Sequence, residues 1–254
     1  MKTIAIIQAR VGSTRLPGKV LLDLLGKTVL ERVIDRVSAA RMIKDVVVAT
    51  TVGKEDLKIV ELCARLGVSV FCGSVDDVLD RYYQATKKYN ASQVVRITSD
   101  CPLIDPGVID KVVDLHLSEG ADYTTNILKE TFPDGEDVEV IKVESLNKAW
   151  SEARLASERE HVTVYIRKHP ELFKHMNYEY KTDLSKKRWT LDNAEDYEFI
   201  KEIYKNIFSR DKIFSMEDVI SFLAENPDIE RLNHHINRNE GYTKSVREDK
   251  TVKE

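Results

Sequence analysis

Short apolar runs alternate with amphipathic segments along the first half of the chain. Runs rich in β-type residues predict strands over 3–7, 46–51, 68–71 and 93–98. Between them, apolar positions spaced as on one helix face predict helices over 29–37, 56–66 and 75–89. This strand–helix alternation is typical of an α/β fold, with a mainly parallel, buried sheet and helices on both faces.

The alternation stops near residue 123. Residues 123–143 contain the turn signal Pro133-Asp134-Gly135 and then alternating valines, which predict an antiparallel excursion. Helices are expected over 145–154, 158–168 and 194–208, and a short strand over 188–191. A further helix should begin after Ser215, with Asp218 at its third position. We expect one domain over 1–230 and a polar tail over 231–254.

Composition restricts the class of protein. The 254 residues are 42% hydrophobic and 32% charged, which suits a globular domain. The chain has no apolar run of membrane-spanning length and only four consecutive apolar residues near its start, so we expect neither a membrane span nor a signal peptide, and a cytoplasmic location. Three cysteines without metal-site spacing are expected to be reduced thiols.

The charge is unevenly distributed. The formal net charge of −4 argues against broad nucleic-acid binding. Residues 1–22 nevertheless contain Lys2, Arg10, Arg15 and Lys19 and no acidic residue. Such a local positive field suits a small polyanion.

The sequence QARVGSTRLPGK over 8–19 directly follows the first predicted strand. Ligands of open α/β sheets bind at the carboxyl ends of strands. Glycines let backbone amides approach an anion, and arginine and lysine neutralise phosphate charge. We predict a polyphosphate-binding loop, in which the useful residues are Arg10, Gly12, Ser13, Thr14, Arg15, Gly18 and Lys19.

Two common phosphate loops are excluded by spacing. Five residues separate Gly12 from Gly18, and Val20 follows Lys19, so the segment is not a P-loop. The dinucleotide fingerprint G-x-G-x-x-G is also absent from the sequence. The remaining alternative is a solvated turn with incidental basic residues.

Two aspartates are candidate metal ligands. Asp100 follows the predicted strand 93–98, at the same sheet edge as the loop 8–19, where a carboxylate suits Mg²⁺. The alternative is a turn or cap, although Asp105 before Pro106 fits a cap better. Asp192 has capping-box spacing to Glu195, and its local pattern alone favours a helix N-cap.

The motifs together resemble a known family. The loop 8–19 is similar to the opening motif of the cytidylyltransferases that make CMP-activated acidic sugars, including the CMP-Kdo and CMP-sialic acid synthetases. The likeness is greatest to the spore-coat polysaccharide SpsF-like branch, and further segments resemble that branch in order over nearly the whole chain: 76–85, 94–106, 132–140, 157–167, 188–200 and 237–245. The resemblance implies a nucleotide-diphospho-sugar transferase fold of the GT-A type, a three-layer α/β/α arrangement, and usually a homodimer.

The resemblance also implies roles for residues. Arg10, Ser13, Arg15 and Lys19 match nucleotide and triphosphate contacts, with Arg15 and Lys19 stabilising charge on pyrophosphate. Asp100 and Asp192 match the two metal aspartates, which raises Asp192 from a cap to a Mg²⁺ ligand. The cytosine and ribose are expected near four positions: Ala9, Gly73, Ser74 and Arg96.

The implied activity is transfer of CMP from CTP to a sugar acceptor. The expected acceptor is an acidic nonulosonate-type sugar or a related precursor of cell-surface polysaccharide. Glu136 departs from a position that is often apolar in the family, and Asn193-Ala194 replace Thr-Pro. Two alternatives remain: another nucleoside triphosphate with a sugar phosphate or phosphonate, and a non-catalytic nucleotide-binding partner of polysaccharide assembly.

Overall fold

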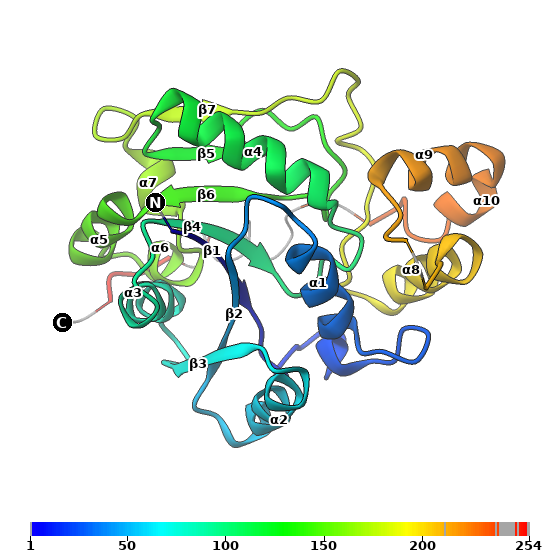
Figure 1. Ribbon diagram of the computed structural model, residues 1–254, viewed down its shortest axis with the longest axis horizontal. Helices are drawn as coiled ribbons and strands as arrows, with labels where there is room; N and C mark the ends of the chain where they lie inside the picture. Colours follow the sequence, from blue (N-terminus) through cyan, green and yellow to red (C-terminus); the bar gives the residue numbers. More distant parts are fainter. Residues whose placement is uncertain (1, 211, 237, 239–246, 248, 253–254) are drawn as a thin grey trace.

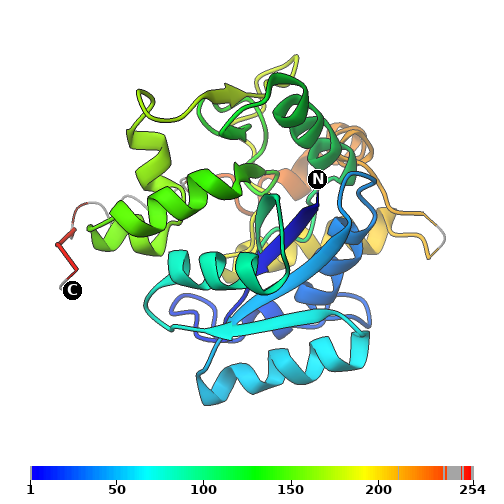
Figure 2. The same cartoon turned by 60° about the vertical axis from the view of Figure 1, so that its left-hand side comes forward.

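The computed structural model describes the chain apart from residues 1, 211, 237, 239–246, 248 and 253–254. Seven strands of the described residues form one mixed sheet in the order β3-β2-β1-β4-β6-β5-β7 (Figure 1). The strands are β1 (Thr3–Gln8), β2 (Asp45–Thr51), β3 (Ser69–Gly73), β4 (Gln93–Thr98), β5 (Tyr123–Thr125), β6 (Glu139–Lys142) and β7 (His175–Asn177). Their directions change across the sheet, as the turned view shows for β3 and β1 (Figure 2), which is the usual strand twist.

The first four strands are parallel, as the sequence predicts. β1 lies between β2 and β4 and pairs with both in parallel, with Ile7 opposite Val48 and Ile97. Helices connect these strands, and both faces of β1 are therefore covered, which explains its continuous apolar sequence. The carboxyl ends of β1 and β4 lie at one edge, so the loop 8–19 and Asp100 become neighbours.

Helices form a layer on each face of the sheet. Ala5 and Ile7 of β1 pack into one apolar cluster with α1, α2, α4, α8 and α9, whereas Ile4 and Ile6 pack into a second with α3, α5 and α7. The three-layer arrangement is therefore confirmed. The helices are α1 (Val29–Ser38), α2 (Leu57–Leu66), α3 (Val78–Lys88), α4 (Pro106–Glu119), α5 (Val143–Glu152), α6 (Ala156–Glu160), α7 (Val164–Lys168), α8 (Ala194–Ile207), α9 (Met216–Glu225) and α10 (Pro227–Glu230), with short 3₁₀ helices η1 (Lys19–Leu21) and η2 (Lys54–Asp56).

The segment 123–143 contributes antiparallel strands to the main sheet. β6 pairs antiparallel with both β4 and β5, while β7 adds in parallel to β5. The antiparallel element predicted from the turn signal is present. It extends the central sheet, because residues 126–138 connect β5 to β6 and β6 pairs with β4.

Two local predictions are wrong. The helix expected over 158–168 is divided into α6 and α7, because Val162 adopts φ 58°, a left-handed conformation that interrupts a helix. The strand expected over 188–191 is absent, and an isolated bridge joins Arg188 to Asp134. Its backbone partners lie in loops, since Trp189 N donates to Asp134 O and Leu191 N to Asp100 O.

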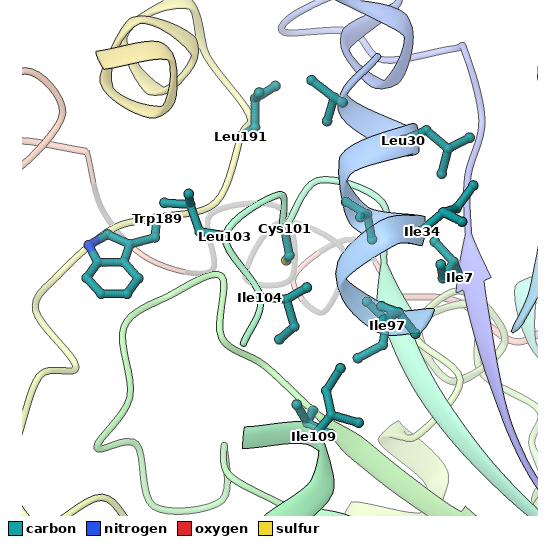
Figure 3. Packing of buried hydrophobic residues seen from close by; sticks show 14 of the residues in the cluster. Ile7, Leu30, Ile34, Ile97, Cys101, Leu103, Ile104, Ile109, Trp189 and Leu191 are labelled. Carbon is teal, nitrogen blue, oxygen red and sulfur yellow. The ribbon is translucent and has the colours of Figure 1, made fainter. Parts of the chain in front are cut away.

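The loop after β4 is anchored in the core. Figure 3 shows Cys101, Leu103 and Ile104 of this loop among side chains of α1, α4 and the segment 189–191. All three are buried. Because these side chains after Asp100 and the buried Ile97 before it resist displacement, the carboxylate beyond the strand end has a fixed position.

Several further expectations concern the chain as a whole. Cys63, Cys72 and Cys101 are free thiols. No helix among the described residues is long and apolar enough to cross a membrane. In the expected tail, Asn233 is buried and donates to Arg188 O and Asp196, and Ser157 donates to Asp249. Most of the motif 237–245 lies outside the described residues, and the division at residue 230 stays a prediction.

The turn at Gly135 provides a test of the packing around the segment 188–191. Gly135 has φ +111°, and a Cβ there would lie 2.6 Å from the carbonyl carbon of Trp189. Gly135→Ala should lower the free energy of unfolding in urea by about 3 kcal/mol or more, through strain and backbone overlap. Gly26→Ala is the matched control, since φ is +78° but no described atom lies within 4 Å, and should cost about 1 kcal/mol. Equal losses would contradict the packing argument.

Candidate active site

The ammonium of Lys19 lies between two carboxylates at the sheet edge. Lys19 Nζ is 2.7 Å from Asp100 Oδ2, 2.7 Å from Asp192 Oδ1 and 2.9 Å from the carbonyl oxygen of Leu191. Arg15 adds an ion pair to the other oxygen of Asp192 at 2.8 Å. The structure thus brings together the four residues that the sequence assigned to catalysis, from regions far apart in the chain.

Backbone contacts set the distance between the two carboxylates. Lys19 begins η1 at the end of the basic loop, and Asp100 is the second residue after β4. The amide of Leu191 donates to the carbonyl of Asp100 at 2.8 Å, which attaches the segment before Asp192 to that loop. The two aspartates are therefore held next to each other by main-chain geometry.

The capping interpretation of Asp192 is wrong by one residue. The N-cap of α8 is Asn193, and Asp196 at the third helical position accepts from the amides of Asp192 and Asn193, each at 2.9 Å. The helix starts one residue later than the Asp192–Glu195 spacing suggests. The Asp192 side chain is consequently available to Lys19 and Arg15.

Arg188 is a residue that sequence reasoning missed. Its position in the run Lys186-Lys187-Arg188 favoured a solvated turn, yet its side chain is buried. The guanidinium binds both oxygens of Asp196 at 2.9 Å, Asp134 at 3.1 Å and Asp192 at 3.5 Å. A charge run gives no signal for this role, since the fold must bring Asp134, which is 54 residues away, to the same guanidinium as the nearby Asp192 and Asp196.

The electrostatics of the two carboxylates follow from these contacts. Burial alone would raise the pKa of Asp100, but the Lys19 ammonium overcomes it and lowers that pKa to about 2. Burial likewise opposes the charge of Lys19, and Asp100 and Asp192 raise its pKa. Asp100 is therefore ionised and Lys19 protonated at neutral pH.

A second acidic group lies beside this centre. Burial and the neighbouring Asp137 raise the pKa of Asp134 to about 7, and burial raises that of Asp137 to about 6. Arg238 pairs with Asp137 at 2.8 Å. The turn Pro133-Asp134-Gly135 thus serves the site as well as the chain reversal.

Glu136, the departure from the family pattern, is fully buried. Its carboxyl accepts from the amide of Asp105 at 2.8 Å, and burial raises its pKa well above the usual range. Asp105 itself is the N-cap of α4, as expected, and accepts from Gly107 N. Glu136 therefore supports the turn before α4 through its hydrogen bond with the Asp105 amide.

The basic loop keeps its shape through internal hydrogen bonds. Val11 N donates to Asp56 at 2.7 Å, and the amides of Ser13 and Gly18 donate to Val11 O. Arg10, Gly12 and Arg15 are exposed, while Ser13 is half-buried. The cations therefore project from a loop whose backbone is already fixed.

The residues expected near a base and ribose occupy the neighbouring strand ends. Ala9 is buried and its amide donates to Ala49 O. A Cβ at Gly73 would lie 2.8 Å from Arg81 Cγ, so glycine there permits close packing of Arg81. Ser74 accepts from Asp77 N at 3.1 Å, and Arg96 pairs with Glu139 and with Gln8 of β1.

The oxygen atoms that surround Lys19 Nζ are suitable ligands for a magnesium ion. Two carboxylates and the carbonyl of Leu191 already surround one cation at 2.7–2.9 Å, and Mg²⁺ prefers oxygen ligands of this kind. The described residues contain no cluster of three or more His, Cys, Asp or Glu side chains arranged around a metal. A site with two protein carboxylates agrees with the way Mg²⁺ usually binds, since the ion keeps waters and substrate phosphates as further ligands.

Comparison with known proteins decides the family. Residues 4–220 match the family model described as cytidylyltransferase. This chain is a member of the cytidylyltransferase family. Its nucleotidyltransferase activity follows from that membership, and the strand-end loop and paired aspartates lie within the matched residues.

Relatives agree with this assignment. The cytidylyltransferase is 34% identical to the spore coat polysaccharide biosynthesis protein SpsF of Bacillus subtilis, over 88% of this chain and 94% of that protein. It is 42% identical to the uncharacterized protein MJ1063 of Methanocaldococcus jannaschii, over 93% of this chain and 96% of that protein. Both likenesses extend over most of each chain.

Solved structures confirm the fold. A cytidylyltransferase from Leptospira borgpetersenii superposes with a TM-score of 0.88 and 40% identity, over 94% of this chain and 100% of that chain. The structure of CMP:2-keto-3-deoxy-manno-octonic acid synthetase with CTP has a TM-score of 0.65 over 82% of this chain and 100% of that chain. At 16% identity this second likeness shows the fold alone, the nucleotide-diphospho-sugar transferase fold that the sequence motifs implied.

Replacing the shared cation tests the electrostatics of the centre. Lys19→Met leaves Asp100 and Asp192 facing each other, and should lower the free energy of unfolding at pH 7 by about 2 kcal/mol. The folded-state pKa of Asp100 lies below its ordinary value of 3.8, so this stability is present above pH 4 and is lost as pH falls towards 2. The deficit of the variant should therefore shrink between pH 4 and pH 2.

Urea unfolding of both proteins across this pH range measures the difference. Lys148→Met is the control, because its pair with Glu152 is exposed and screened by solvent and should contribute little to stability. A deficit that is the same at every pH would contradict a shared charge as its cause.

Proposed function

We propose that this cytidylyltransferase transfers CMP from CTP to a hydroxyl of a sugar acceptor and releases pyrophosphate, with Mg²⁺ as its metal. The observation that supports this most directly is the convergence of Asp100 and Asp192 on one cation position beside the basic loop. Nucleotidyl transfer requires carboxylates that bind a metal ion and basic side chains that bind phosphate. Here both kinds of group lie at one edge of the sheet.

The basic loop supplies the proposed triphosphate contacts. Arg10 and Arg15 are exposed at the sheet edge, and Lys19 lies deeper beside the carboxylates. Arginine forks match phosphate oxygens in pairs, and a lysine acts as a point charge. We assign Gly12 and Ser13 to the same contacts, because they lie between these cations on the rigid loop.

Asp100 and Asp192 would hold the magnesium ion. When bound, the ion would neutralise phosphate charge and lower the pKa of the attacking hydroxyl. Lys19 now balances these same carboxylates. With the carboxylates committed to the metal, its ammonium becomes available to a phosphate oxygen, so we assign Lys19 and Arg15 to the negative charge that develops on the leaving pyrophosphate.

The proposed reaction is an in-line displacement. The sugar hydroxyl oxygen forms a bond to the α-phosphorus and loses its proton, while the bond from that phosphorus to the bridging oxygen breaks and pyrophosphate departs. The protein contributes mainly orientation and charge neutralisation to such a step. Arg188 positions Asp192 through Asp196 and is not assigned a contact with substrate.

The base and the acceptor are assigned from the strand ends and from the relatives. We place the cytosine and ribose beside Ala9, Gly73, Ser74 and Arg96, at the carboxyl ends of β1, β3 and β4. We propose an acidic nonulosonate-type sugar or a related precursor of cell-surface polysaccharide as acceptor, in keeping with the printed role of SpsF in spore coat polysaccharide biosynthesis. A homodimer acting in the cytoplasm is likewise proposed from the family resemblance, and light scattering after size exclusion measures the oligomeric state.

Removing one metal carboxylate tests the assignment. Asp100→Asn should lower pyrophosphate release from CTP by at least about 100-fold, because the loss removes charge that acts in the transition state. The measurement is a coupled pyrophosphate assay with Mg²⁺, CTP and a panel of acidic sugars. Asp228→Asn, an exposed surface change, is the control and should retain full activity.

A nucleotide panel in the same assay separates the remaining functions. Preference for UTP, GTP or ATP with a sugar phosphate would contradict CTP as the donor. Binding of CTP without pyrophosphate release from any acceptor would favour a non-catalytic partner of polysaccharide assembly. Near-normal turnover by Asp100→Asn would contradict the metal assignment.

A further inference from the structure

A cavity of about 680 Å³ lies beside α1, and neither Asp100 nor Asp192 lines it. It is bounded by α1, the end of α8 and the segment that leads to α9 (Figure 1). We name it the α1–α8 cavity. Its lining residues are Leu25, Gly26, Lys27, Arg32, Asp35, Arg36, Tyr204, Phe208, Ser209, Arg210, Lys212, Ile213 and Phe214.

Positive charge dominates this lining. Lys27, Arg32, Arg36, Arg210 and Lys212 face one carboxylate among the described lining residues, that of Asp35. Lys27 already pairs with Asp35 at 2.6 Å. Asp211, which lies between two of these cations in the sequence, is outside the described residues, and counting it still leaves a positive excess.

Two of the cations are buried arginines that pair with no described carboxylate. Arg32 is 4% exposed and donates to the carbonyls of Leu24 and Leu25 at 2.7–2.9 Å. Arg36 is 3% exposed and donates to carbonyls of Leu103, Ile104 and Phe214 at 2.6–3.0 Å. Carbonyl dipoles satisfy these hydrogen-bond donors of the two guanidinium groups but do not neutralise their positive charges. Buried arginines are ordinarily paired with an acid.

Aromatic rings fix the orientation of both guanidinium groups. Arg32 stacks 4.3 Å from the centroid of Phe208, and Arg36 stacks 4.3 Å from that of Phe214. Arg32 Nη1 has no hydrogen-bond partner in the described part of the chain. This nitrogen is also not one of the solvent-inaccessible side-chain atoms that lack a partner. An edge of this buried guanidinium is thus left for the cavity that it lines.

We propose that the α1–α8 cavity binds a small phosphate-bearing molecule. The two arginines are one helical turn apart on the same face of α1, so their side chains begin roughly 5–6 Å from each other, a spacing suited to one diphosphate or phosphate ester. The cation excess is larger than one carboxylate ligand would balance. Ile213, Phe214 and Leu25 provide an apolar wall for the rest of the molecule.

One residue that lines the cavity contacts the active-site loop. Arg36 binds the carbonyls of Leu103 and Ile104, which follow Asp100 on the same loop, and the Tyr204 hydroxyl donates to Pro102 O at 2.7 Å. A phosphate at Arg36 therefore lies one side chain away from the backbone that positions Asp100. This site does not depend on the proposed sugar chemistry.

The test uses inorganic pyrophosphate as the probe, without added metal. The starting protein is the full chain with Arg10→Ala and Arg15→Ala, which removes two active-site cations. Isothermal titration at low salt should show binding of pyrophosphate. Adding Arg210→Ala and Lys212→Ala at the cavity rim should weaken that binding by about tenfold or more, since two charged contacts are lost.

A matched pair of surface changes serves as the control. Lys201→Ala and Lys205→Ala remove the same charge from α8, where both lysines pair with neighbouring glutamates and neither lines the cavity. This pair should change the affinity by less than about twofold, because it alters only the screened overall charge. Equal weakening by both pairs, or no pyrophosphate binding by the starting protein, overturns the proposal.

Discussion

The structure depends on one cation shared by two carboxylates at the edge of the sheet. Asp100 and Asp192 would repel each other at this distance, and their partial burial would increase the cost. Lys19 removes both problems with a single ammonium, while Arg15 and Arg188 approach Asp192 from the solvent side and from the core. A charge arrangement of this kind allows two acids to be kept together in readiness for another cation.

Such an arrangement is useful only if the acids cannot move apart. The side chains that flank Asp100 are inserted in the core, and the amide of Leu191 attaches the second segment directly to its carbonyl. Asp196 accepts hydrogen bonds from two backbone amides, those of Asp192 and Asn193, and both of its carboxylate oxygens bind Arg188. The cost of holding like charges is therefore met by packing and hydrogen bonds outside the centre, which agrees with electrostatic preorganisation.

The sequence predicted the parts that depend on local patterns. Buried parallel strands need continuous apolar runs, so β1 to β4 and the strand-end position of Asp100 were predictable. Arg188 was not, because a basic run looks the same whether solvent surrounds it or the fold brings Asp134, Asp192 and Asp196 to one guanidinium. The cap at Asn193 was missed since a shift of one residue decides which side chain is released. CTP as the donor is proposed from the likeness to known cytidylyltransferases and not from the loop.

Arginine partners distinguish two kinds of basic site in this fold. In the candidate active site, Arg15 and Arg188 are balanced by carboxylates, so these cations keep in place the acids to which we assign the metal. At the α1–α8 cavity, Arg32 and Arg36 are balanced by carbonyl dipoles, which orient the guanidinium groups without cancelling their charge. Stacking on Phe208 and Phe214 holds them rigid. Rigid, desolvated and uncompensated cations have the properties of a preformed anion site, because little reorganisation is needed when the anion binds.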